Sequence, residues 1–185
     1  MAEQQQQQQQ QQVAAKKSLI SRPLDLVYFL YFATHIPVTL AIDFQVFCPP
    51  QWVPQVLKDA LKFYTETYKD PFMGSSAPTY WFLSFIVCEL LVQLPFFFIA
   101  CVGLFKDSKY IRLPLAIYGA HVATTVLPTI AEVLFNEALD LNTAERQTLF
   151  GFYAPYFILP LIITVDSFVR INNYLKVDVS TKKTQ

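Results

Sequence analysis

Four long apolar stretches limit what this chain can fold into. They cover roughly residues 24–42, 79–105, 111–135 and 148–171. A helix of about 20 apolar residues crosses the hydrocarbon core of a bilayer, so each stretch is long enough to span a membrane. Only 15% of the residues are charged, against roughly a quarter in soluble domains. The sequence therefore predicts an all-α membrane protein with four transmembrane helices.

Prolines are concentrated in these stretches. Six of the 12 prolines lie inside or at the edges of the predicted spans, namely Pro37, Pro95, Pro114, Pro128, Pro155 and Pro160. Each proline removes a backbone hydrogen-bond donor and favours a kink. We expect four kinked helices around a cavity rather than a straight-packed bundle.

The long polar segment between the first two stretches, residues 43–78, contains one helical pattern. Within residues 52–64 the apolar side chains recur at helical spacing, which predicts one apolar face made of Val53, Val56, Leu57, Ala60, Leu61 and Tyr64. Such an amphipathic helix is typical of the membrane surface. We interpret it as a lid or interfacial helix in the first lumenal loop.

The positions of lysine and arginine predict the orientation in the membrane. Ten of the 14 lie before the first span, between the second and third, or after the fourth: Lys16, Lys17, Arg22, Lys106, Lys109, Arg112, Arg170, Lys176, Lys182 and Lys183. The positive-inside rule then places both termini in the cytosol. The final residues, Lys182-Lys183-Thr184-Gln185, resemble a dilysine retrieval signal. We therefore expect a multi-pass protein of the endoplasmic reticulum membrane.

Composition divides the chain into three parts. An unbroken polyglutamine run, Gln4 to Gln12, predicts a disordered cytosolic tail over residues 1–21. This start lacks the pattern of a signal peptide. Residues 22–172 are the predicted membrane domain, and residues 173–185 a cytosolic tail. The net charge of zero offers no basic field for nucleic acid.

Glu89 is the most costly residue in the predicted spans. It lies deep in the second apolar stretch, with Gln93 four residues later on the same helix face. A charged side chain at the bilayer centre costs about 2.5–3.5 kcal/mol on insertion scales, so it indicates a functional site. The alternative is a structural hydrogen bond between helices.

Two other spans carry polar stripes that could face Glu89. The first has His35, Thr39 and Asp43 at successive four-residue steps. Asp43 closes this span, so a solvated carboxylate at a helix end is an equal interpretation. The third span has a comparable stripe, and the fourth adds tyrosines beside a proline: His121, Thr125, Thr129, Glu132, Tyr153 and Tyr156.

Carboxyl groups in an apolar, aromatic-rich pocket suit an amphiphile with one polar group, such as a sterol, or with one protonated amine. Metal binding is disfavoured because His35 and His121 have no second ligand at helical spacing. Cys88 and Cys101 lie in apolar runs, where packing is the simpler role. We predict no metal, no cofactor and no catalytic residue.

Several phrases of the sequence resemble one family. They lie at residues 30–43 (LYFATHIPVTLAID), 69–71 (KDP), 88–97 (CELLVQLPFF), 111–114 (IRLP), 121–125 (HVATT) and 153–156 (YAPY). The chain resembles the sigma-2 receptor family of EXPERA-domain proteins over about residues 24–172. The emopamil-binding sterol isomerases are more distant relatives.

The resemblance implies a homodimeric, four-helix protein of the endoplasmic reticulum that binds oxysterols and cationic amphiphiles. It implies that Asp43 pairs with a ligand amine and that Glu89 hydrogen-bonds to Asp43 and orients it. Asp70 would be structural. Gln93, Thr125 and Tyr156 would line or support the cavity.

The resemblance also leaves three functions to compare. The main expectation is binding or trafficking of sterols. One alternative is an accessory role in protein quality control or in targeting of mitochondrial precursors, with which a fungal branch of the family is associated. The other is sterol isomerisation, with His35, Asp43 and Glu89 as acid and base groups.

Overall fold

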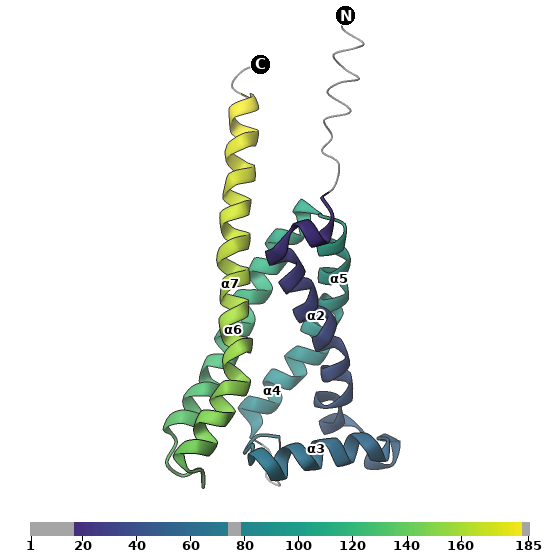
Figure 1. Ribbon diagram of the computed structural model, residues 1–185, viewed down its shortest axis with the longest axis vertical. Helices are drawn as coiled ribbons and strands as arrows, with labels where there is room; N and C mark the ends of the chain where they lie inside the picture. Colours follow the sequence, from purple (N-terminus) through teal and green to yellow (C-terminus); the bar gives the residue numbers. More distant parts are fainter. Residues whose placement is uncertain (1–16, 74–78, 183–185) are drawn as a thin grey trace, which may run out of the picture.

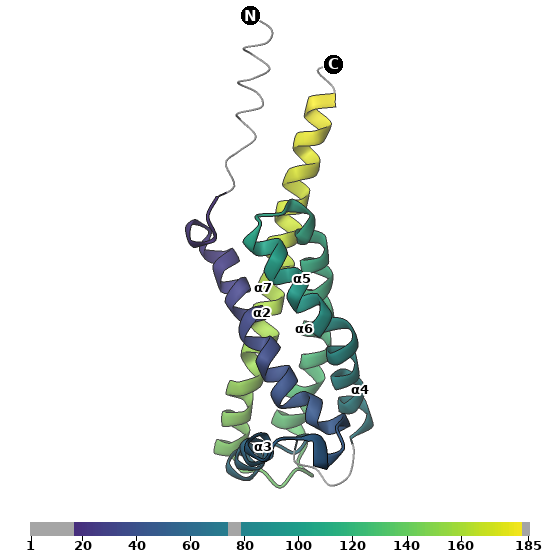
Figure 2. The same cartoon turned by 90° about the vertical axis from the view of Figure 1, so that its right-hand side faces the viewer.

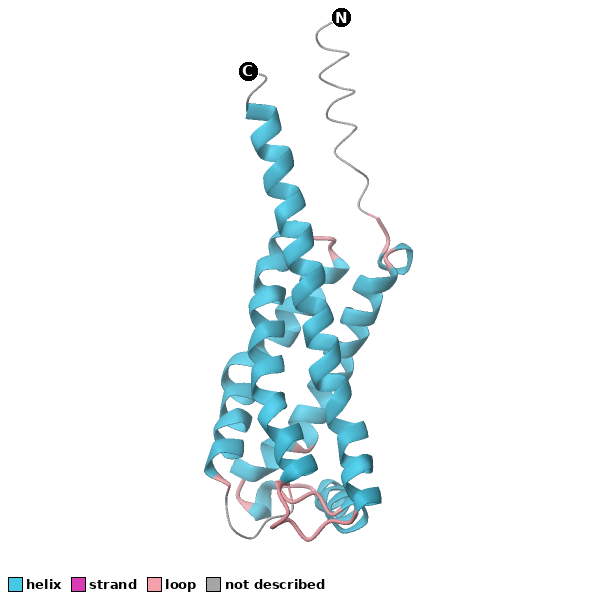
Figure 3. Cartoon of the chain, turned by 90° about the vertical axis from the view of Figure 1, so that its left-hand side faces the viewer, coloured by secondary structure: helices cyan, strands magenta, loops and turns pink. Residues whose placement is uncertain are grey.

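The chain folds into helices joined by short loops (Figure 3). The computed structural model describes residues 17–73 and 79–182, with side chains to residue 176. Five helices build four candidate spans: α2 (Pro23–Ala41), α4 (Tyr80–Cys88), α5 (Leu94–Phe105), α6 (Arg112–Phe135) and α7 (Thr143–Lys182). The spans are Pro23–Phe47, Tyr80–Phe105, Lys109–Phe135 and Thr143–Lys176. The predicted all-α membrane fold with four spanning helices is therefore confirmed.

The second span is interrupted where a proline requires it. Between α4 and α5 lies a π-helical turn, Glu89–Gln93, in which the Leu94 N–H donates to the Glu89 carbonyl five residues earlier. Pro95 follows at once and has no N–H to offer the carbonyl four residues before it, so the regular ladder cannot continue. Figure 1 shows α4 inclined to α5 as a result.

Short turns connect α2 to α3 (Gln55–Tyr68). Two 3₁₀ turns form this connection: Asp43–Phe47 is the last part of the first span, and Pro50–Trp52 follows it. Helix α3 then crosses the end of the bundle (Figures 1 and 2). It ends at Tyr68, and the left-handed backbone of the next residue, Lys69 (φ 53), reverses the chain.

The bundle consists of two helix pairs, α2 with α5 and α6 with α7. Gly119 allows α6 to approach α7 closely, because a Cβ there would collide with the Pro160 carbonyl and the Thr164 hydroxyl. A hydrophobic core joins the pairs in the half away from α3: Tyr28, Phe32, Phe97, Ala100, Leu104, Ile111, Leu115, Tyr118, Val122 and Ile163. Towards α3 the pairs diverge (Figure 1).

The ends of the chain differ from the predicted tails. Residues 1–16, with the polyglutamine run, lie outside the described residues, and Leu19–Ser21 form a 3₁₀ turn. Helix α7 continues through the predicted C-terminal tail to Lys182. The dilysine pair extends beyond the described residues at Lys183. The start of α2 and the end of α7 lie at the same end of the bundle, opposite α3 (Figure 1).

Candidate functional site

A cavity of about 330 Å³ lies near α3, lined by residues of α2, α3, α4, α6 and α7. Its polar lining consists of His35, Asp43, Tyr64, Glu89, Gln93, Thr125, Thr129, Tyr153 and Tyr156. The remaining lining is apolar and includes Phe82, Phe85 and Phe152. Among the described residues that line this cavity, none is a lysine or an arginine.

Glu89 enters the cavity from the first position of the π-helical turn. The Thr39 hydroxyl donates to Glu89 Oε1 at 2.7 Å, and His35 Nε2 lies 3.6 Å from the same oxygen. The His35 ring stacks on Phe97 with centroids 4.9 Å apart and lies equally close to Tyr156. The carboxyl group is therefore held in place by residues of α2.

Asp43 reaches the same cavity from the 3₁₀ turn that follows α2. The neighbouring Gln45 amide holds this turn by donating to the Ala41 carbonyl at 2.8 Å and to the Leu57 carbonyl of α3 at 3.0 Å. Asp43 is half-buried rather than fully solvated. Two carboxyl groups on separate elements thus face one apolar space.

Asp70 anchors the loop that closes the α3 end. Its buried carboxylate accepts hydrogen bonds from the Tyr64 and Tyr153 hydroxyls at 2.8 and 2.7 Å, and from the backbone N–H groups of Phe72 and Met73. Burial, and then the nearby Asp70 carboxylate, raise the pKa of Tyr64, so its phenol stays protonated and donates. Asp70 thereby joins α3 to α7.

The structure brings most of the predicted site residues together. Six of them line the cavity: His35, Asp43, Glu89, Gln93, Thr125 and Tyr156. Thr39 is fully buried behind Glu89, so it supports the site instead of lining it. His121, expected as a structural polar residue, also lies outside the cavity lining, and its Nε2 is buried without a partner among the described residues.

One implied contact differs in the structure. The family resemblance implied a hydrogen bond from Glu89 to Asp43, but no such bond occurs among the described residues, where Thr39 is the hydrogen-bond partner of Glu89. Thr39 lies within α2, four residues before Asp43, which belongs to the 3₁₀ turn after the helix. Thr39 is the fully buried residue of this polar stripe, and its hydroxyl reaches Glu89.

The predicted apolar face of α3 also divides in two. Leu57, Leu61 and Tyr64 are half-buried against the bundle, whereas Val56 and Ala60 are exposed. The sequence-based prediction took these five and Val53, which precedes α3, as one face. It also missed the roles of Tyr64 and Tyr153 as donors to Asp70, which lies six positions from Tyr64 but 83 positions from Tyr153.

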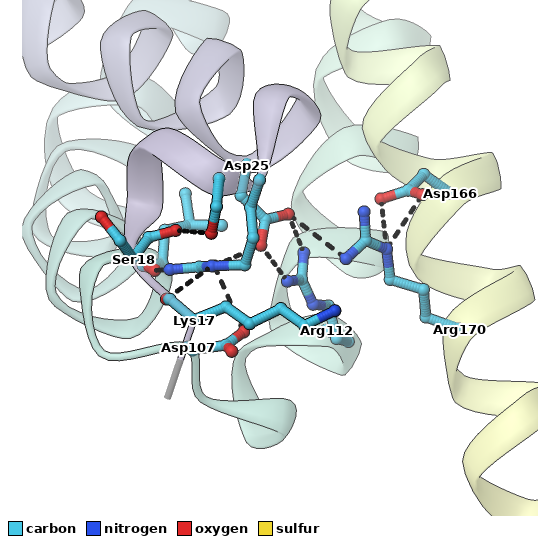
Figure 4. A network of polar contacts seen from close by, with 10 residues as sticks. Lys17, Ser18, Asp25, Asp107, Arg112, Asp166 and Arg170 are labelled. Atoms are coloured by element: carbon cyan, nitrogen blue, oxygen red, sulfur yellow. Dashed lines mark hydrogen bonds and ion pairs between the residues drawn. The ribbon is translucent and has the colours of Figure 1, made fainter. Parts of the chain in front are cut away.

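A second polar cluster lies at the opposite end of the bundle (Figure 4). The Asp25 carboxylate, 0% exposed, receives two hydrogen bonds from Arg112 at 2.9 and 2.6 Å. Arg22 also bonds to it and Arg170 lies at 3.4 Å. We call Asp25 with these three residues the arginine cluster. In the sequence these arginines served only as a topology signal, and their pairing with Asp25 appears only in the structure.

No group of three or more His, Cys, Asp or Glu side chains in the described part of the chain is arranged to hold a metal ion. The polar groups of the cavity come from two carboxyls, one imidazole, one amide and several hydroxyls. This set can accept hydrogen bonds from an ammonium or a hydroxyl group.

Comparison with known proteins matches residues 56–167 to the family model described as EXPERA (EXPanded EBP superfamily). Sigma intracellular receptor 2 of Xenopus tropicalis is 42% identical over 153 residues, covering 79% of this chain and 88% of the relative. The Homo sapiens protein of that name is 38% identical over 164 residues, covering 83% and 91%. Efficient mitochondria targeting-associated protein 19 of Schizosaccharomyces pombe is 29% identical over 148 residues, covering 77% and 74%.

Proposed function

Because the chain belongs to the EXPERA family, we propose that it binds an amphiphile in the cavity beside α3. The ligand classes are a sterol or oxysterol and an apolar molecule with a protonated amine. One observation carries the proposal: Asp43 and Glu89 face the same apolar cavity, and its described lining includes no lysine or arginine. An unmatched carboxyl pair in apolar surroundings favours a cationic or hydrogen-bond-donating guest.

The amine of a cationic amphiphile donates to Asp43, and Glu89 supports it from the adjacent wall. A hydrogen bond between charged groups contributes about 1.5–3 kcal/mol. The hydrocarbon part packs against the phenylalanines, where each Å² of apolar surface removed from water contributes about 25 cal/mol. Aromatic rings such as Tyr156 add a cation–π attraction.

A sterol uses the same site differently. Its hydroxyl donates to one carboxyl group and its rings fill the apolar part of the cavity. A cavity of about 330 Å³ lies at the lower end of the range of small-molecule sites, about 300–1,000 Å³. The site therefore favours a ligand with one polar end over one with charges at both ends.

The cellular setting belongs to the same proposal. We place the protein in the endoplasmic reticulum membrane as a homodimer, with both termini in the cytosol and α3 on the lumenal side. Its role there is sterol homeostasis or trafficking. The excess of Lys and Arg in the segments on one side of the membrane, ten of 14, supports the orientation.

Two other functions each have one supporting observation. The 29% identity to a Schizosaccharomyces pombe protein named for efficient mitochondria targeting favours an accessory role in precursor targeting. The 3.6 Å distance from His35 Nε2 to Glu89 Oε1 favours proton transfer, as in a sterol double-bond isomerase. The curated relatives at 37–42% identity carry the name of a receptor rather than an enzyme.

The test of the main proposal is binding by the Asp43→Asn variant. The variant should lose affinity for a tritiated cationic amphiphile by about 10- to 100-fold, which corresponds to one charge-assisted hydrogen bond. Asp140→Asn, an exposed loop residue, is the matched control and should bind normally. Unchanged affinity of the Asp43→Asn protein would remove Asp43 from the site.

Mass spectrometry of lipids that co-purify with the full chain separates the three functions. Retained sterol supports binding. Conversion of an added Δ8 sterol by the purified protein would establish isomerisation instead. A lipid-free protein whose deletion disturbs only precursor targeting would favour the accessory role.

A further inference from the structure

Helix α3 is attached to the bundle by one of its faces. Four half-buried side chains at i, i+4, i+7 and i+11 form this inner face: Leu57, Leu61, Tyr64 and Tyr68. The Tyr64 and Tyr68 rings lie 6.0 and 4.7 Å from the Phe152 ring of α7. The hydrogen bonds of Tyr64 to Asp70 and of Gln45 to Leu57 hold the same side of the helix.

A second face of α3 is apolar and exposed in the described part of the chain. It consists of Val56, Ala60 and Phe63, at i, i+4 and i+7, which we call the outer stripe. Val56 is 70% exposed and Phe63 64%, and Trp52 just before the helix is 75% exposed. A helix that met only water outside its packed face would carry polar residues there.

The third face of α3 is polar and satisfied by its own pairs. Gln55 donates to Asp59 at 2.8 Å, and Lys62 lies 3.8 Å from Glu66. Helix α3 thus has three different faces: one packs against the bundle, one is apolar and exposed, and one is polar. This division is typical of a helix lying in a membrane interface.

The position of α3 in the fold agrees with this division. It crosses the end of the bundle, where the first span has finished at Phe47 and the second begins at Tyr80 (Figures 1 and 2). The end of the first span carries exposed Phe44 and Phe47. Apolar surface therefore continues along the chain from the lipid-facing side of a span to Trp52 and the outer stripe.

A second copy of the chain is a poorer occupant of the outer stripe. A free aromatic side chain offers about 150–250 Å², so the stripe and Trp52 together offer about 500 Å². A stable protein interface needs roughly 800 Å² from each partner. A bilayer needs no such minimum, because the spans already hold the protein in it.

We propose that the outer stripe and Trp52 are seated in the lipid of the adjacent leaflet, at the boundary between headgroups and acyl chains. The apolar face of such a helix is buried about 5–10 Å into this boundary. The cavity wall supplied by Tyr64 is then fixed from outside by the membrane surface as well as from inside by Asp70. The proposal does not depend on which ligand the cavity holds.

Tryptophan fluorescence of the full chain in phosphatidylcholine vesicles tests the proposal. Trp52 and Trp81 are its two tryptophans, so Trp81→Phe leaves Trp52 as the reporter. Lipid brominated near the headgroup should quench its emission about twofold more than lipid brominated near the chain end, as expected for the depth of an interfacial helix. Aqueous iodide should quench it weakly.

Two neighbouring positions supply a matched comparison. In a chain with Trp52→Phe and Trp81→Phe, Phe63→Trp reports on the outer stripe and Lys62→Trp on the polar face. We expect brominated lipid to quench only the Phe63→Trp protein, and iodide only the Lys62→Trp protein. Strong iodide quenching of both would overturn the proposal in favour of water. Protection of the Phe63→Trp protein from both quenchers would overturn it in favour of a protein partner.

Discussion

At one end of the bundle the Asp25 carboxylate meets three arginines, whereas near the other end Asp43 and Glu89 face a cavity whose described lining has neither arginine nor lysine. Both places bury carboxyl groups in a protein of the membrane. The first has its counter-ions built in and has no need of a ligand. The difference suggests that the arginine cluster stabilises the bundle and that the cavity takes its missing positive or donor group from outside.

The comparison predicts stability effects of very different size for matched substitutions. Asp25→Asn should lower the free energy of unfolding by about 3–5 kcal/mol, because it leaves the buried Arg112 guanidinium without its carboxylate. Asp43→Asn should leave it almost unchanged. Unfolding in detergent micelles, followed by far-UV circular dichroism, measures both. Equal stability of the two variants would contradict the assignment of a structural role to Asp25 and a binding role to Asp43.

Glu89→Gln should weaken binding of a cationic amphiphile by about 10-fold, since it removes one charge from the pair but keeps a hydrogen-bonding group of the same size. Its stability should stay near that of the parent chain. Equilibrium radioligand binding gives the dissociation constant, and Glu137→Gln in the exposed α6–α7 loop is the control. A large loss of stability would instead assign Glu89 a structural role like that of Asp25.

Tyr153→Phe should destabilise the protein by about 1.5–3 kcal/mol, because Asp70 loses one of its two phenol donors. Hydrogen exchange of α3 should rise at the same time, since α3 and α7 are joined through this carboxylate. Tyr110→Phe is a suitable comparison because Tyr110 is exposed. If hydrogen exchange of α3 stays at the rate of the parent chain, Asp70 does not stabilise the attachment of α3 to α7.

Thr39→Val should have the smallest effect, about 1 kcal/mol or a fivefold loss of amine affinity, as it removes a single hydrogen bond to Glu89. Thr34→Val, on the exposed side of α2, should bind like the parent chain. Competition binding resolves a change of this size. An increase in affinity would mean that Thr39 competes with the ligand for Glu89.

The spans could be predicted from the sequence because length and hydropathy are local properties. Glu89 and Gln93 were expected together, and both line the cavity although the helix between them is π-helical. Relations between helices were harder. Arg112 meets Asp25 across 87 positions, and Tyr153 meets Asp70 across 83. One sequence does not set the register of one helix against another, so these pairs, and the contact of Glu89 with Thr39, appear only in the structure.

Helix α7 connects the two ends that this comparison separates. Tyr153 at the cavity and Arg170 at the arginine cluster lie on one helix, about 25 Å apart at 1.5 Å per residue. Between them, Pro155 and Pro160 each remove a backbone hydrogen bond. The helix is thus fixed near both ends, by Arg170 beside Asp25 and by Tyr153 at Asp70, while its backbone hydrogen-bond ladder is interrupted between them.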